Sequence, residues 1–121
     1  MQPEERDAAL LWDMRQAACE IVEFTRGLHY QQFESNKVVR YAVERQILVI
    51  GEAAKNISSA FKNAHSEIPW QPIISQRNIL AHEYGEILTE RIWRVASERT
   101  PELIRLLDAI VPEPPGEDRG A

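Results

Sequence analysis

Apolar side chains recur every three or four residues along most of this chain, which is the spacing of helices with one buried face. The first such segment runs from about Glu4 to Arg26, and Gly27 is its expected C-cap. Its apolar stripe consists of Leu10, Leu11, Met14, Ala17, Ala18, Ile21, Val22 and Thr25. The first predicted helix is therefore long and amphipathic.

The next segment is a second long helix, predicted from about Lys37 to Ser59 after a connection at residues 28–35. Either Ser35 or Asn36 is its expected N-cap. Gly51 lies inside this helix, where glycine costs about 1 kcal/mol relative to alanine. A glycine is tolerated in such a place when another backbone approaches closely, so we expect tight packing there.

The helical pattern breaks after Phe61, and a loop is expected as far as Pro69. A third helix opens at Trp70, with a proline in its first turn, and continues to about His82. Gly85 is its expected stop.

The last apolar segments are predicted to form a fourth helix that starts after Thr89 as N-cap and is restarted or kinked at Thr100-Pro101. There Thr100 is the expected N-cap and Pro101 the first helical residue. No alternating strand pattern competes with these helices. We therefore predict an all-α fold, an antiparallel four-helix bundle whose last helix is broken.

This bundle is expected to occupy residues 1–111 as one domain. Residues 112–121 hold three prolines and two glycines without an apolar stripe, and we expect them to be disordered. The polar, acidic amino end does not resemble a secretory signal, and no window is apolar enough for a membrane span. The single cysteine, Cys19, forms no internal disulfide and no zinc pattern, so a cytoplasmic protein is expected.

The net charge of −5 is distributed unevenly. Residues 1–36 carry seven acids and three bases, and residues 106–121 carry four acids and one base. The middle, residues 37–105, carries ten bases and eight acids, which permits contact with a phosphate backbone without demanding it.

The richest chemistry lies in residues 77–84, which read Arg-Asn-Ile-Leu-Ala-His-Glu-Tyr. Histidine, with an ordinary pKa of about 6.5, can move protons at neutral pH, and arginine offers a planar fork to phosphate oxygens. Asn78 can add a hydrogen bond. No acidic cluster of the kind that holds magnesium is visible, so this set favours metal-independent RNA cleavage without a cofactor, leaving a 2′,3′-cyclic phosphate.

Two features of this stretch leave alternatives open. Arg77 and His82 are five residues apart, about 140° around an ideal helix, so the helix must loosen, the arginine must curl back, or a second subunit must complete the site. Alternatively, Arg77 pairs with a glutamate while His82 and Tyr84 merely end a helix. Glu52, beside Gly51, is either a solvated outer acid or the partner of an arginine.

The order of Arg77, Asn78, His82 and Tyr84 resembles the Arg-Asn-x-x-x-His-x-Tyr motif of the HEPN superfamily, specifically of its HepT-like toxins. The resemblance covers roughly residues 7–110. The similar residues outside the motif are Ile50-Gly51-Glu52-Ala53, Ile68-Pro69-Trp70 and Ile92-Trp93.

This resemblance implies a helical homodimer with a composite cleft, acting as a metal-independent endoribonuclease. Residues matching Arg77 and His82 would be catalytic, and Asn78 would support them. It also implies a toxin whose antitoxin is a minimal nucleotidyltransferase that transfers AMP to the tyrosine matching Tyr84. The alternative function is a non-catalytic helical subunit that docks a nucleotidyltransferase.

Overall fold

The computed structural model describes residues 3–82 and 85–111, with the backbone alone at residues 3, 4, 77, 81, 82 and 85–87. No strand occurs within these ranges, which confirms the predicted all-α class. The helices, in chain order, are α1 (Pro3–Thr25), α2 (Tyr30–Ser35), α3 (Lys37–Asn56), α4 (Ser59–Ala64), α5 (Trp70–His82), α6 (Gly85–Arg94), the π-helix η1 (Val95–Arg99) and α7 (Thr100–Asp108). None of the described helices is both long and apolar enough to cross a membrane.

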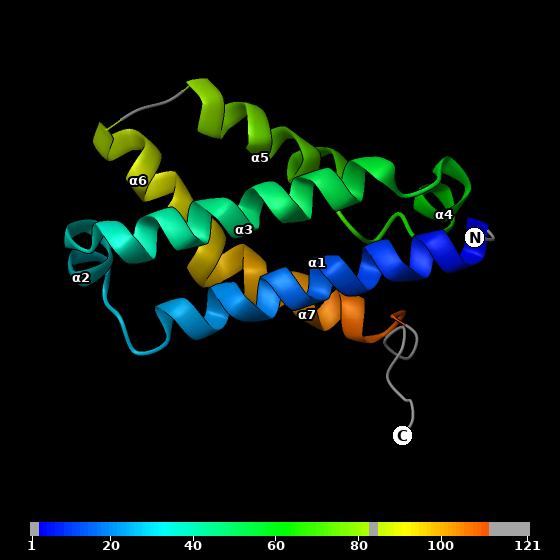
Figure 1. Ribbon diagram of the computed structural model, residues 1–121, viewed down its shortest axis with the longest axis horizontal. Coiled ribbons are helices and arrows are strands. Elements are labelled where there is room, and N and C mark those ends of the chain that lie inside the picture. The colour runs from blue at the N-terminus through cyan, green and yellow to red at the C-terminus, as the bar shows by residue number, and fades with distance from the viewer. Residues whose placement is uncertain (1–2, 83–84, 112–121) are drawn as a thin grey trace.

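The centre of the molecule is the antiparallel pair α1 and α3, which lie side by side (Figure 1). The Gln46 amide donates to the Glu20 carboxylate at 2.6 Å across this pair. Side chains with no exposed surface line the contact and form the middle of the core: Met14, Ala18, Ile21, Val43 and Ala54. Because both helices bury a full-length apolar stripe, their periodicity alone was enough to predict them.

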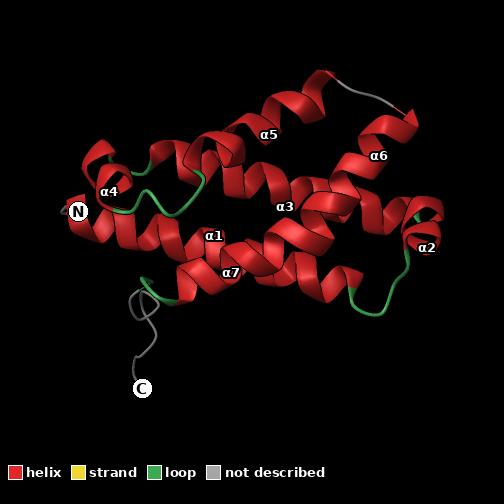
Figure 2. Cartoon of the chain, turned by 180° about the vertical axis from the view of Figure 1, so that it is seen from behind, coloured by secondary structure: helices red, strands yellow, loops and turns green. Residues whose placement is uncertain are grey.

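The remaining helices cover two sides of this pair. α5 packs along α3, and the continuous run of α6, η1 and α7 crosses the pair diagonally on the face shown in Figure 2. The run begins beside α2 and ends beside α1, where the Arg15 guanidinium donates to Asp108 at 2.6 Å. This ion pair holds the pKa of Arg15 above its ordinary value and fastens the end of α7.

Two short helices occupy stretches that were predicted as loops. In the connection at 28–35, α2 is held by the Gln32 side chain, which accepts from the His29 amide at 2.8 Å, and by Phe33, which is fully buried. Between Phe61 and Pro69, the expected loop was wrong at its start, since α4 continues to Ala64. A helix of six residues has too few turns to show periodicity, so the sequence pattern did not reveal either.

The predicted helix ends can be compared with the structure one by one. Gly27 has a φ of 78°, the left-handed conformation of a glycine C-cap, and the Asn36 side chain accepts from the Val39 amide, which makes Asn36 the N-cap of α3. Ser35 is not the cap, because it ends α2. α3 ends at Asn56, three residues before the predicted end.

The predicted ends of the last helices were less accurate. α5 does end at His82, but Gly85 begins α6 rather than serving as a stop. Thr89 lies buried inside α6 and is not an N-cap. Threonine favours caps in general, but here it fills a core position.

The irregularity predicted at Thr100-Pro101 takes the form of the π-helix η1. Ile92, Ala96 and Thr100 are each 2% exposed, although four-residue steps rotate an ideal helix face by about 40° each time. The wider π turn removes part of this drift and keeps all three side chains on the core. The amide and the hydroxyl of Thr100 both donate to the Val95 carbonyl, so Thr100 closes the π turn and is not an N-cap, and Pro101 is the second residue of α7.

A buried carboxylate joins the amino end of α1 to the start of α4. Asp7 is 8% exposed and accepts from the Ser58 amide at 2.9 Å and from the Ser58 hydroxyl at 2.6 Å. The same hydroxyl oxygen accepts from the Phe61 amide at 3.2 Å and caps α4. One carboxylate therefore sets the geometry of a helix whose N-cap lies 51 residues later in the chain.

Replacing Asp7 with alanine should lower the free energy of unfolding by about 2 kcal/mol, because two hydrogen bonds to a carboxyl group are lost and the Ser58 donors stay partly buried. The change is measured by urea denaturation. Asp13→Ala, at an exposed position of the same helix, should shift the stability by less than about 0.5 kcal/mol. Equal effects of the two substitutions would contradict the assigned role of Asp7.

Candidate functional site

α5 carries three of the four predicted site residues, and its amino end is firmly held. Trp70 is 8% exposed, and its indole nitrogen donates to the His65 carbonyl at 3.0 Å. Phe61 stacks on the His65 ring at 4.3 Å between centroids and meets the Trp70 ring edge-on. Ile68, just before α5, is 1% exposed. The tryptophan and the isoleucine thus fix where α5 starts.

α5 packs along α3, and the close backbone approach expected at Gly51 stays a prediction. Gly51 is buried in α3, on the helix against which α5 lies. The contact is continued by Ile73 and Ile74, which are half-buried against the core. α3 is therefore the support that positions the candidate site.

The carboxyl end of α5 is the candidate site itself. The helix ends at His82, and α6 begins at Gly85. This end lies at the edge of the molecule, away from α1 (Figures 1 and 2). A large substrate can approach such an edge without opening the core.

The predicted site residues are placed by the backbone of α5. Arg77 lies in the second half of the helix, and His82 is its last residue. Asn78 is exposed, and it shares a helix face with His82 because the two are four residues apart. The side chains of Arg77 and His82, and the whole of Tyr84, lie outside the described atoms.

Because α5 is helical through His82, residues 77 and 82 lie about 140° apart around the helix axis. Of the three ways to bring the two side chains together, loosening of the helix before His82 is not observed. A curled arginine or a second subunit remains. The roles of Arg77, Asn78, His82 and Tyr84 therefore stay predictions.

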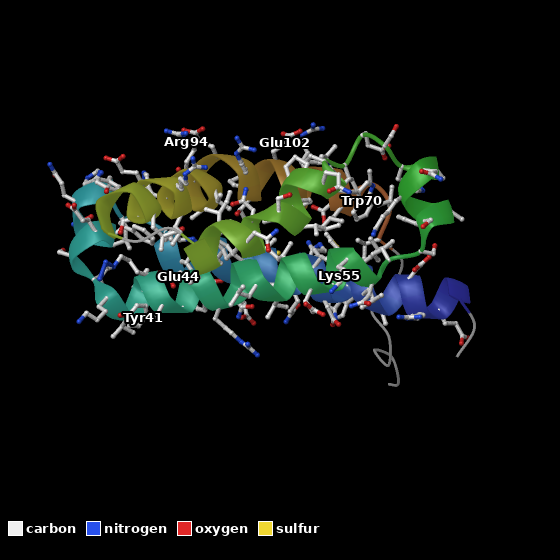
Figure 3. The ribbon with its side chains drawn as sticks, turned by 90° about the horizontal axis from the view of Figure 1, so that it is seen from above. Tyr41, Glu44, Lys55, Trp70, Arg94 and Glu102 are labelled. Carbon is white, nitrogen blue, oxygen red and sulfur yellow. The ribbon has the colours of Figure 1, made fainter. Side chains whose placement is uncertain are left out.

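A partly buried carboxylate on α3, with an arginine nearby, was not foreseen from the sequence. Glu44 lies on α3 toward α6 (Figure 3), and burial raises the pKa of its carboxyl, a rise that the nearby Arg40 guanidinium partly offsets. The Nε of Arg40 is buried and has no hydrogen-bond partner among the described atoms. The four-residue spacing of Arg40 and Glu44 was a visible signal, but such pairs are usually exposed.

Two half-open clefts flank α3. One, of about 410 Å³, lies between α5 and the run from η1 to α7, and its walls are mostly apolar. The other, of about 480 Å³, lies between α1 and the outer side of α3 and includes the charged residues Asp13, Arg45 and Glu52. Glu52 is exposed there, but it is not without a partner in this chain.

The model of the family described as "Ribonuclease HepT-like" matches residues 14–110 of this chain. The chain belongs to the HepT-like ribonuclease family. A relative from Thermococcus cleftensis, named "Probable ribonuclease HepT", is 38% identical over 93 residues, which cover 77% of this chain and 84% of that protein. No solved structure matches the chain.

Further relatives of this HepT-like chain come from Methanocaldococcus jannaschii. One, named "Putative RNase MJ1380", is 33% identical over 102 residues, covering 84% of this chain and 94% of that protein. Another, named "Putative RNase MJ0127", is 31% identical over 119 residues and covers 98% of both chains. The resemblance inferred from the motif is thereby confirmed at the level of the family.

Glu44→Gln should raise the urea midpoint at pH 7, because the raised pKa means that the ionised carboxylate costs stability in the folded state. Below about pH 3, well under the ordinary pKa of glutamate, the carboxyl is protonated in both states and the difference should disappear. Urea titrations at the two pH values measure this. Glu34→Gln, at an exposed position, is the matched control, and a gain of Glu44→Gln that is equal at both pH values would contradict the assignment.

Proposed function

We propose that this HepT-like protein is a metal-independent endoribonuclease and the toxin of a toxin–antitoxin pair. The observation that carries the proposal is the intact Arg77-Asn78-x-x-x-His82 motif at the carboxyl end of α5, in a chain that belongs to a family described as ribonucleases. The names of its relatives, which are ribonuclease names, support the same reaction.

The reaction requires the 2′-hydroxyl of RNA to attack the adjacent phosphorus. His82 takes the proton of this hydroxyl as the new bond from the 2′-oxygen to phosphorus forms. The bond to the 5′-oxygen breaks, and that oxygen leaves with a proton from a second acid or from water. The products are a 2′,3′-cyclic phosphate and a free 5′-hydroxyl, with no oxidation or reduction.

Arg77 stabilises negative charge and transfers no proton. Its guanidinium is permanently positive and has a planar fork that matches two phosphate oxygens, so it stabilises the negative charge that grows on the phosphate during attack. Asn78 is exposed and follows Arg77 in the chain. Its side-chain amide donates a hydrogen bond to the same phosphate or to the adjacent phosphate of the RNA.

The site is completed by a second copy of the chain in a homodimer. The divergence of Arg77 and His82 along an unbroken helix supports this, since one copy alone aims the two groups in different directions. Two copies also supply two histidines, one to accept the first proton and one to deliver the second.

Tyr84 is the regulatory residue in this proposal. A nucleotidyltransferase antitoxin transfers AMP from ATP to the Tyr84 hydroxyl, forming a phosphodiester and releasing pyrophosphate. The added group is bulky and negative and lies two residues from His82 in the chain. It blocks the cleft and repels the phosphate of RNA.

Cleavage of labelled RNA by the purified chain should persist in EDTA and fall at least about 100-fold in His82→Ala and in Arg77→Ala. Arg94→Ala, on the exposed side of α6, is the control and should retain the wild-type rate. Loss of cleavage in EDTA would refute the metal-independent route. Full activity of both site variants would remove these residues from the mechanism and favour the non-catalytic alternative.

Incubation with the nucleotidyltransferase and ATP should add one AMP to the wild-type chain and abolish its cleavage of RNA, because the new phosphate repels the substrate. The rate of Tyr84→Phe should be the same with and without the transferase. Mass spectrometry locates the AMP. Modification of another residue, or inhibition of Tyr84→Phe, would assign the regulation elsewhere.

A further inference from the structure

The amino half of α3 exposes two large apolar side chains that the fold leaves uncovered. Val38 is 78% exposed and Tyr41 is 58% exposed, and these are the large apolar residues singled out by exposure in the described chain. They are three residues apart, so they are neighbours on the helix surface. Tyr41 lies on the outer edge of α3, away from α6 (Figure 3). Its ring is therefore open to a partner from outside the chain.

Basic residues lie on both sides of this ring. Lys37 and Arg45 are exposed and lie four residues before and four residues after Tyr41, so the three side chains follow one line along the helix. At 1.5 Å per residue the line is about 12 Å long. We call the set of Lys37, Val38, Tyr41 and Arg45 the α3 stripe.

No acid interrupts the α3 stripe. The exposed side chains of residues 36–51, a range that the structure describes completely, are Asn36 and the residues of the stripe. The neighbouring acids of α3 lie elsewhere, since Glu44 is partly buried toward α6 and Glu52 is about two turns beyond Arg45. This surface is therefore positive, although the chain as a whole has a net charge of −5.

The two cations of the stripe are not explained by the fold. Lys37 lies in the first turn of α3, which holds no acid, although acids are the residues that stabilise the amino end of a helix. Neither Lys37 nor Arg45 forms an ion pair within the described part of the chain. Cations placed on both sides of an exposed ring fit a ligand that is both anionic and aromatic.

We infer that the α3 stripe binds single-stranded RNA, with one base stacked on Tyr41 and the phosphates on either side of it bound by Lys37 and Arg45. This inference rests on the proposed function, because it names a surface outside the catalytic motif that binds the same substrate. The bases of a single strand are free to stack on an aromatic ring, and such stacking strengthens binding without selecting a sequence. Val38 packs against the edge of the stacked nucleotide.

Each cation of the stripe suits a phosphate for its own reason. The guanidinium of Arg45 has a planar fork that matches two phosphate oxygens. The ammonium of Lys37 is a compact charge, and the positive end of the α3 dipole adds to it in the first turn. Because one cation lies on each side of the ring, a strand that follows α3 meets a phosphate contact before and after the stacked base.

The stripe lies at the same end of the molecule as the candidate catalytic residues. α3 begins beside α2, which also contacts α6, and α5 runs toward this end (Figure 1). The chain passes from His82 to Gly85 there. Tyr41 is only about one turn from the start of α3. A strand bound at the end of α5 can therefore continue over the amino end of α3 onto the stripe.

Other ligands use less of this surface. A membrane surface requires a broad apolar face, whereas the stripe offers one ring and one valine. Duplex RNA keeps its bases stacked inside the helix, so it can contact the two cations but not the ring. A single strand can use all of them.

The stacking contact is tested with a short labelled RNA whose 2′-hydroxyls are all methylated, so that it binds without being cleaved. In anisotropy titrations, Tyr41→Leu should raise the dissociation constant about tenfold, while Tyr41→Phe should stay within about twofold, because the ring carries the contact. A strand of the same length without bases should bind wild type and Tyr41→Leu equally. Tyr41 is exposed, so circular dichroism should show an unchanged fold in both variants.

The phosphate contacts are tested by the dependence of binding on salt. Lys37→Ala and Arg45→Ala should each reduce the slope of log affinity against log salt by about 0.7, the value for one phosphate of a single strand. Lys55→Ala is the matched control, because this exposed lysine lies in the last turn of the same helix (Figure 3). It should change neither the affinity nor the slope.

Cleavage assays separate this inference from the proposed function. On unmodified RNA, Tyr41→Leu should raise KM about tenfold and leave kcat within about twofold, since the ring contacts the substrate away from the reacting bond. If the stripe variants bind methylated RNA as wild type does, the inference is overturned, even where cleavage still requires His82. If they lose affinity as expected and the wild-type chain cleaves no RNA, the stripe remains an RNA site and the nuclease proposal fails. A wild-type chain that binds phosphatidylserine vesicles but not methylated RNA also overturns the inference.

Discussion

The antiparallel contact between α1 and α3 is the interaction on which the rest of the molecule depends. Ala18 and Ala54 are fully buried in it, and such small side chains let two long helices approach closely. α5 and the run from α6 to α7 then use this pair as their support. A change that moved α3 would therefore move α5, and with it the candidate catalytic residues.

Because α3 supports α5, the candidate site can lie at the edge of the molecule and still have a fixed backbone. α5 is anchored at its amino end by Trp70 and along its length by α3, and its last residue is His82. Chemistry at the end of a supported helix combines access for a large substrate with a fixed backbone.

The sequence was sufficient for the long helices and insufficient for the short ones. α1 and α3 bury whole stripes, so their spacing carried the information. α2 depends on one buried ring, Phe33, and α4 depends on Asp7, which lies 51 residues before Ser58. No local pattern records a partner so distant. Thr89 and Thr100 were misplaced because threonine suits a cap and a crowded core position equally well.

For the candidate site, the residue types and their order could be predicted from the sequence. How the side chains come together in space could not. Five residues on a helix separate Arg77 from His82 by more than a third of a turn, so their cooperation depends on side-chain reach or on another chain.

The π turn at Val95–Arg99 has a consequence for how this chain tolerates insertions and deletions. It holds one residue more per turn than an α-helix would, and Ile92 and Leu103 nevertheless face the same core. Losing one residue here would convert the turn to α-helix while the flanking faces stayed near their places. Elsewhere in the run, the same loss would rotate every following side chain by about 100°. Length differences between related chains are therefore expected to collect at this turn.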